Sequence, residues 1–118
     1  MSQMKCRVLF GPANIGDIIN ETRKAIQTIT LVESRLSSVY GFGSAFRGEE
    51  FQDIDILAVL GKKNGSMIET YYALREVLVS ATRVYGAPIH LTVLTEPEFE
   101  SRPLKCMKEL VPLWTNES

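Results

Sequence analysis

Residues 53–60, DIDILAVL, constrain the fold of this chain more than any other segment. The run is short, rich in apolar and β-branched residues, and followed by the turn-forming GKKNG, which together predict a buried strand. Side chains alternate between the two faces of a strand, so Asp53 and Asp55 share a face. The opposite face takes three apolar residues: Ile54, Ile56 and Ala58.

The two aspartates form an unfavourable pair unless a third group neutralises them. Neighbouring carboxylates repel each other, and each loses solvation when the sheet packs. A divalent cation between them reverses this balance, and Mg²⁺ in particular prefers carboxylate, water and phosphate oxygens. We therefore predict that Asp53 and Asp55 bind Mg²⁺ or Mn²⁺. Taken alone, the Asp-Ile-Asp pattern is also explained by an edge strand with solvated aspartates.

The turn before this strand, GFGSAFRG at residues 41–48, offers groups that suit a phosphate. Gly43 permits close approach of the backbone, and Ser44 supplies a hydroxyl and an N–H near the start of a short helical segment. Arg47 carries a planar fork of donors that can reach the same anion. We expect Gly43, Ser44 and Arg47 to bind a nucleotide phosphate, whereas a β-turn without a ligand is the simpler alternative.

The remaining segments predict a mixed sheet flanked by helices, in the α/β (α+β) class. Apolar residues recur at three- and four-residue steps in two segments, which predicts helices at 17–36 and 66–85. Asn14 or Asp17 is expected to cap the first, Ser66 to cap the second and Gly86 to end it. Prolines at 97 and 103 suggest further helix starts. Strands are expected at 5–10, 37–42, 53–60, 87–94 and 111–114.

Composition limits the classes of protein to which the chain can belong. With 118 residues it is expected to be one domain, and its net charge of −1 gives no reason to expect nucleic-acid or membrane binding. No apolar run approaches the roughly 18–20 residues that span a bilayer. Cys6 and Cys106 match no metal-ligand spacing, and we interpret them as free thiols in a cytoplasmic protein.

The segment GFGSAFRGEEFQDIDILAVL resembles the signature of the DNA polymerase beta-like nucleotidyltransferase superfamily. That signature is a Gly-Ser turn, often followed by Arg-Gly, and then an Asp-apolar-Asp strand. At this length the chain is most similar to the minimal nucleotidyltransferases, which are small single domains. The likeness extends in weaker form from about residue 20 to the end, whereas residues 1–16, an N-terminal strand and turn, lie outside it.

The resemblance implies a nucleotidyltransferase-like fold that holds a Mg²⁺-nucleoside triphosphate, such as ATP, between turn and strand. Carried over by position, Gly43 and Ser44 would bind the triphosphate, and Asp53 and Asp55 would be catalytic metal ligands. The implied reaction transfers a nucleotidyl group to an acceptor and releases pyrophosphate. Minimal nucleotidyltransferases often act beside a small helical protein in toxin–antitoxin-like pairs, so such a partner is expected. The oligomeric state stays open, with a homo-oligomer among the alternatives.

The chain departs from the family pattern in two places. The segment between Ser44 and Asp53 is slightly shorter than usual. Active members also carry a third carboxylate on a neighbouring strand, where this chain has His90. This residue could act as a catalytic general base, mark a domain that binds without catalysis, or be a hydrogen-bonded histidine without a role. Glu96 and Glu98, just beyond the strand, are the alternative source of the missing oxygen.

Overall fold

The computed structural model describes residues 9–30, 36–61, 67–101 and 109–115. These form an α+β fold in which a four-stranded mixed sheet is accompanied by three α-helices and two short 3₁₀ turns. The expected class of fold is therefore confirmed. In chain order the elements are α1 (Ile15–Thr30), β1 (Leu36–Phe42), η1 (Ser44–Arg47), β2 (Ile54–Leu60), α2 (Met67–Ala81), η2 (Arg83–Tyr85), β3 (Ile89–Thr95), α3 (Glu96–Ser101) and β4 (Val111–Thr115).

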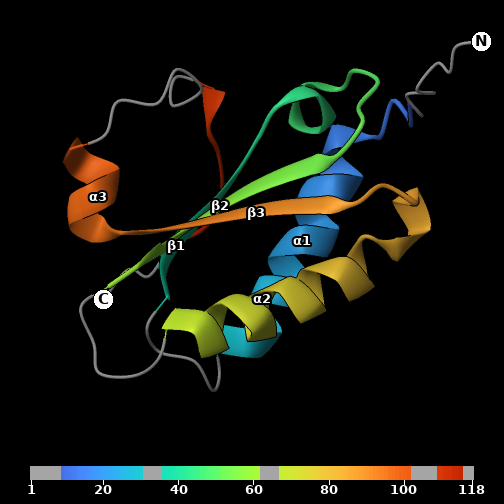
Figure 1. The fold of residues 1–118 in the computed structure, drawn as a ribbon. Coiled ribbons are helices and arrows are strands. Elements are labelled where there is room, and N and C mark those ends of the chain that lie inside the picture. The colour runs from blue at the N-terminus through green and yellow to red at the C-terminus, as the bar shows by residue number, and fades with distance from the viewer. Residues whose placement is uncertain (1–8, 31–35, 62–66, 102–108, 116–118) are drawn as a thin grey trace, which may run out of the picture.

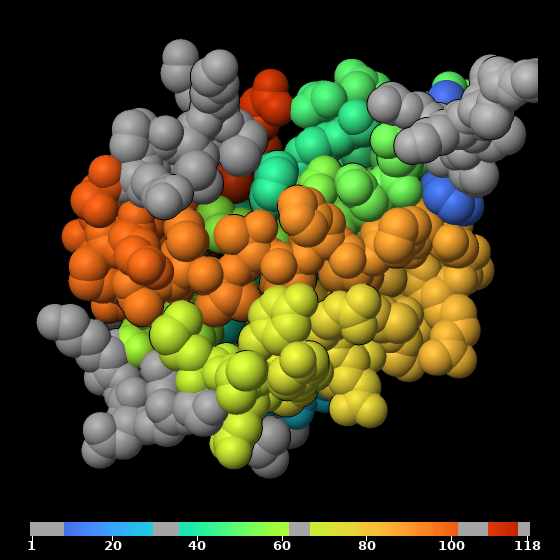
Figure 2. Space-filling view, viewed as in Figure 1, coloured from blue at the N-terminus to red at the C-terminus, as the bar shows by residue number. Residues whose placement is uncertain are grey.

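The sheet has the order β3-β2-β1-β4, so β2 and β1 are its central strands. β2 runs parallel to β3, and β1 is antiparallel to both β2 and β4. Helices α1 and α2 lie together on one side of the sheet, and α3 lies at the end of the sheet away from η1 (Figure 1). The edge strand β3 forms a band across one face of the molecule, between α2 and the segment that leads into β2 (Figure 2).

The alternation expected in β2 is confirmed by its burial. Ile54, Ile56 and Ala58 belong to the core beneath α1 and α2, and each is completely buried. On the other face, Leu57 is also buried, and its register partner Tyr40 stacks on Phe99 of α3. The second half of that face is thus covered by apolar side chains, which leaves the aspartates at the opposite end of the strand.

The first helix was predicted at 17–36, but it begins two residues earlier, at Ile15, and ends before Leu36. The Oδ1 atom of Asn14 accepts a hydrogen bond from the N–H of Asp17 at 3.0 Å, so Asn14 is the cap. The helix ends at Thr30, residues 31–35 lie outside the described residues, and Leu36 begins β1. Leu36 continues the helical spacing of apolar residues, yet it is buried in the sheet as the partner of Leu60.

The other expected elements are reproduced with small shifts at their ends. The second helix ends at Ala81 and is followed by η2, after which Gly86 has the left-handed conformation with φ of 79°. Pro97 stands in the first turn of α3. Ser66, Pro103 and both cysteines lie outside the described residues. Within the described parts, no helix has the length and apolar character that crossing a bilayer requires.

The N-terminal strand expected at residues 5–10 can be assessed only at its end. Phe10 forms an antiparallel bridge with Phe51, through backbone hydrogen bonds of 2.8 and 3.0 Å. The two rings also contact each other, with centroids 6.0 Å apart. This bridge attaches the segment before α1 to the segment between η1 and β2.

The absence of a side chain at Gly41 fixes the position of η1. A Cβ atom on this buried β1 residue would lie 2.5 Å from the ring of Phe46, which is itself almost fully buried. The Phe46 ring therefore occupies the space above Gly41 and anchors η1 to the sheet. Ser44 begins the same 3₁₀ turn, so this contact also places Ser44.

We predict that Gly41→Ala lowers the free energy of unfolding by about 1–3 kcal/mol, because the added methyl group overpacks the site. Phe46→Leu should also be destabilising, by about 1 kcal/mol or more, because it leaves a cavity. In the double variant, however, the smaller side chain makes room for the methyl group. Urea unfolding should therefore give a loss for the double variant that is smaller than the sum of the two single losses, and strict additivity would contradict the contact between Gly41 and Phe46.

Candidate functional site

Asp53 and Asp55 lie close together at the start of β2, as the alternation predicted. Asp53 immediately precedes the strand, and Asp55 is its second residue. Together with His90 they form a group in which one potential ligand atom from each residue lies within 4.8 Å of the others. Both aspartates are half-buried, and 18% of the Asp55 side chain is exposed. The group is therefore open to a small ion and compact enough to surround one.

The Gly-Ser turn lies directly against this group. Phe42 at the end of β1 is the register partner of Asp55, so the next residue, Gly43, passes beside the Asp55 carboxylate. A Cβ atom on Gly43 would collide with Asp55 Oδ2. Gly43 also has a φ of 83°, which L side chains rarely adopt. Both the close approach of the Asp55 carboxylate and the positive φ thus require glycine at this position. Ser44 follows at the start of η1.

His90 is adjacent to Asp55 because the two residues are register partners in the parallel pair β2–β3. The Nδ1 atom of His90 lies 3.2 Å from Oδ1 of Asp55, and 66% of the His90 side chain is exposed. In the tautomer that carries a proton on Nδ1, this nitrogen donates a hydrogen bond to the carboxylate. The structure therefore brings His90 into the group formed by the two aspartates.

Glu96 and Glu98 do not supply the missing oxygen, so that expectation is wrong. Both lie beyond the far end of β3, about 20 Å from His90 at roughly 3.3 Å per residue. The Oε2 atom of Glu96 accepts a hydrogen bond from Ser37 at 2.7 Å. Glu98 Oε1 accepts one from the N–H of Thr95 at 2.9 Å, which caps α3. These contacts are made at the end of the sheet away from the aspartates.

Arg47 lies beside Ser44, where its guanidinium contacts carboxylates. Its Nη2 atom donates to Ser44 Oγ at 3.3 Å, and its Nη1 atom donates to Glu109 Oε1 at 2.8 Å. Nε donates to Glu49 Oε1 at 3.3 Å, and this hydrogen bond is the largest contribution that raises the pKa of Arg47. An anion at Ser44 would compete with these acids for Arg47. The sequence gives no local signal for Glu109 as a partner of Arg47, because the two residues are 62 positions apart.

The electrostatics of the group favour a bound cation. Burial, followed by the charge of Asp53, raises the pKa of Asp55 from 3.8 to about 6, while the hydrogen bond from His90 opposes this rise. At neutral pH the site thus holds two crowded negative charges in a poorly solvated position. Carboxylates are the ligands that Mg²⁺ and Mn²⁺ accept, so these residues fit a divalent cation.

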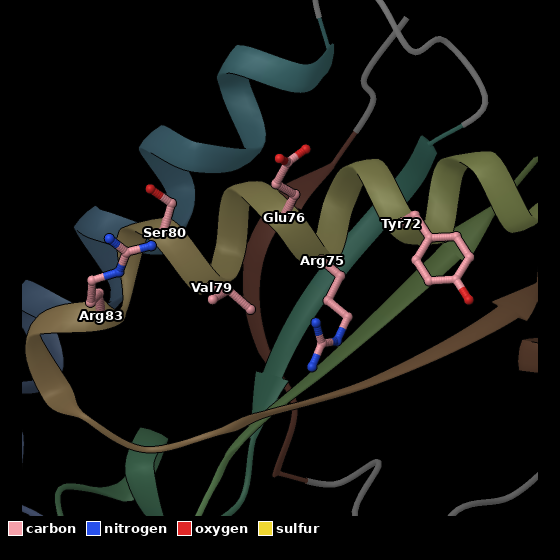
Figure 3. Close-up of a pocket in the computed structure, with 6 residues that line it drawn as sticks. All are labelled: Tyr72, Arg75, Glu76, Val79, Ser80 and Arg83. Atoms are coloured by element: carbon pink, nitrogen blue, oxygen red, sulfur yellow. The ribbon is translucent and has the colours of Figure 1, made fainter.

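A separate hollow of about 480 Å³ lies along the outer side of α2 (Figure 3). Its six lining side chains come from α2 and η2: Tyr72, Arg75, Glu76, Val79, Ser80 and Arg83. None of the predicted site residues is among them. The hollow is therefore separate from the aspartate pair.

Comparison with solved structures shows that the chain has a nucleotidyltransferase-like fold. A candidate nucleotidyltransferase from Sulfolobus solfataricus aligns with a TM-score of 0.56 and 23% identity, over 88% of this chain and 86% of its own. The toxin–antitoxin pair MntA–HepT provides a second match, with a TM-score of 0.50 and 19% identity, over 82% of this chain and 72% of the matched chain. No protein-family model and no curated protein matches the chain. At these identities the comparisons establish the fold alone.

We predict that Asp55→Asn stabilises the metal-free protein at pH 8. An acid with a raised pKa binds its proton more tightly in the folded state, so folding stability falls as pH rises between about 4 and 6. Asparagine removes this loss but keeps an oxygen that can accept from His90. We expect a gain of about 1–2 kcal/mol at pH 8, after allowance for partial solvation, and little gain at pH 4.

Urea unfolding in the presence of a chelator at both pH values measures this difference. Glu100→Gln is the matched control, because Glu100 is an exposed acid on α3 whose neutralisation should change stability little at either pH. Equal destabilisation by Asp55→Asn at pH 4 and pH 8 would show that the charges of the two aspartates do not destabilise the folded state.

Proposed function

We propose that this protein binds a divalent cation together with a nucleoside triphosphate and transfers the nucleotidyl group to an acceptor. The observation that carries the proposal is the contact between Gly43 and the Asp55 carboxylate, which places the Ser44 turn beside the aspartate pair. A phosphate-binding turn and a pair of metal-ligand carboxylates at one position are what this reaction requires. The nucleotidyltransferase-like fold supports the same conclusion.

In the proposed complex, Asp53 and Asp55 would hold Mg²⁺ or Mn²⁺. The bound ion would neutralise charge on the triphosphate and help to align the attacking and leaving oxygens. The Ser44 hydroxyl would contact the triphosphate, and Arg47 would exchange its carboxylate partners for a phosphate oxygen. An acceptor hydroxyl attacks the α-phosphorus, the bond from that phosphorus to the bridging oxygen breaks, and pyrophosphate leaves.

His90 is placed to take part in the proton transfer of this reaction. The acceptor hydroxyl must lose its proton, and an exposed imidazole next to Asp55 can accept it when the ring is neutral. Asp55, hydrogen-bonded to Nδ1, would hold the ring in the tautomer that leaves Nε2 free to act as the base. In this arrangement His90 performs the proton transfer that the third carboxylate performs in the family.

The second candidate is a domain that binds the nucleotide without transferring it. The observation that favours it is His90 itself, because an imidazole at this register position supplies no negative charge, unlike the carboxylate of active family members. Such a domain would serve as a binding or regulatory subunit. Both candidates require the aspartate pair and the Ser44 turn, and they differ only in turnover.

We predict that nucleotide and divalent cation raise the melting temperature together, and that pyrophosphate is then released. ATP, GTP, CTP and UTP, each with Mg²⁺ or Mn²⁺, should be tested for thermal stabilisation and for pyrophosphate. Asp53→Ala should reduce pyrophosphate release at least about 100-fold, because it removes a metal ligand, whereas Glu100→Gln should have no effect. Thermal stabilisation without pyrophosphate release would favour the domain that binds the nucleotide without transferring it. No stabilisation by any combination of nucleotide and cation would contradict both candidates.

The acceptor is proposed to be a hydroxyl group on a partner protein. The support is the likeness to the MntA–HepT pair, in which one protein of this fold type is found with a partner. Incubation of a cell extract with a nucleoside triphosphate labelled on the α-phosphate should yield a labelled protein band. The band should be missing with Asp53→Ala, and label in nucleic acid instead would exclude a protein acceptor.

A further inference from the structure

His90 is held beside the aspartate pair by the backbone of two strands. It pairs with Asp55 in the parallel ladder of β2 and β3, and the neighbouring pair, Ile54 with Ile89, fixes the register one position earlier. Ile54 is completely buried, and its N–H donates to the carbonyl of Pro88 at 2.9 Å. The Cα atoms of Asp55 and His90 are therefore held at the spacing of adjacent strands, about 4.8 Å.

The separation between His90 and Asp55 matches that of two neighbouring ligands around one ion. Two ligand atoms bonded to the same ion at about 2.1 Å lie about 3.0–3.4 Å apart when adjacent and about 4.2 Å apart when opposite. His90 Nδ1 lies 3.2 Å from Asp55 Oδ1, which fits an adjacent pair. The group as a whole, with atoms within 4.8 Å of one another, is close to this range.

The mixed set of ligands differs from the set that Mg²⁺ prefers. Mg²⁺ is a hard ion that takes oxygen ligands and retains several waters. Mn²⁺, Co²⁺ and Zn²⁺ also accept imidazole nitrogen, and the affinity of nitrogen-containing sites for divalent metals rises from Mn²⁺ to Cu²⁺ and then falls at Zn²⁺. Among the described residues, the structure gives His90 no side-chain partner other than Asp55. Its Nδ1 lone pair is thus available to a metal whenever that nitrogen is deprotonated.

We propose that His90 is a nitrogen ligand of the cation and that the site selects Mn²⁺, Co²⁺ or Zn²⁺ over Mg²⁺. This inference rests on the metal-dependent site proposed above, and it assigns His90 to the metal in place of the proton transfer described there. It concerns which metal the protein takes up, and its test does not depend on turnover.

Metal binding to the nucleotide-free full chain provides the test. Titration calorimetry should give a dissociation constant for Mn²⁺ or Co²⁺ at least about 10-fold lower than for Mg²⁺. Electron spin echo measurements on the Mn²⁺ protein should detect coupling to one imidazole nitrogen. His90→Ala should abolish that coupling and weaken Mn²⁺ and Co²⁺ binding about 10–100-fold, with Mg²⁺ binding changed less than about threefold.

His90→Asp is the sharper variant, because it replaces the nitrogen by a carboxylate. It should strengthen Mg²⁺ binding about 10-fold or more and reduce the preference for Co²⁺. Glu100→Gln should leave every constant unchanged. The nitrogen coupling is measured on the unmodified chain, so the test does not depend on the folding of any variant.

An unmodified protein that binds Mn²⁺ without nitrogen coupling would overturn the proposal, and so would an unchanged Mn²⁺ to Mg²⁺ ratio in a folded His90→Ala variant. Either result would leave His90 as a hydrogen-bond donor to Asp55. Failure of the proposed function is a separate outcome, recognised by nitrogen-coupled Mn²⁺ binding in a protein that no nucleoside triphosphate stabilises. Pyrophosphate release with a metal bound only through oxygen would instead support the function and contradict this inference.

Discussion

The position of the Asp55 carboxylate depends on the register of β2, and the rest of the site depends on that carboxylate. Asp55 pairs with Phe42 on one side and with His90 on the other, so it is the point where β1, β2 and β3 meet. A slip of one residue would turn both aspartates into the core. The completely buried Ile54 and Ile56 prevent such a slip, because the slip would move their side chains out of the core to the opposite face of the sheet. The apolar residues between the aspartates thus determine where the charges lie.

The turn that precedes β2 is fixed by contacts of a different kind. Two glycines admit neighbouring side chains, since Gly41 leaves space for the Phe46 ring and Gly43 leaves space for the Asp55 carboxylate. The first contact is apolar and anchors η1 to the sheet. The second brings the backbone next to a charge. Ser44 lies between Gly43 and Phe46 in the sequence. Its position therefore follows from the packing of Phe46 on one side and from the close approach of Gly43 to the Asp55 carboxylate on the other.

Local patterns in the sequence were sufficient for the four strands of the sheet and for the aspartate pair, because alternation and turn residues act over a few positions. They failed at Leu36, whose spacing continues the first helix although it pairs with Leu60 in the sheet. The contact of Arg47 with Glu109 joins residues 62 positions apart, and no local pattern encodes it. The place of His90 beside Asp55 was expected only by resemblance. Its atomic contact depends on the register of a parallel pair, which alternation alone does not determine.

A histidine at position 90, where a carboxylate would be the alternative, affects the electrostatics of the aspartate pair. The pKa of Asp55 is already raised to about 6 by burial and by Asp53, so a third acid at position 90 would add a further repulsive charge. The imidazole instead offers a hydrogen bond that lowers this pKa. Compared with a third acid, the imidazole therefore adds no charge repulsion to the folded state. It also attracts a hard cation less strongly than a third acid would. In the proposed metal site, ligand type would therefore matter more than charge, and ligand type is the property that distinguishes transition metals from Mg²⁺.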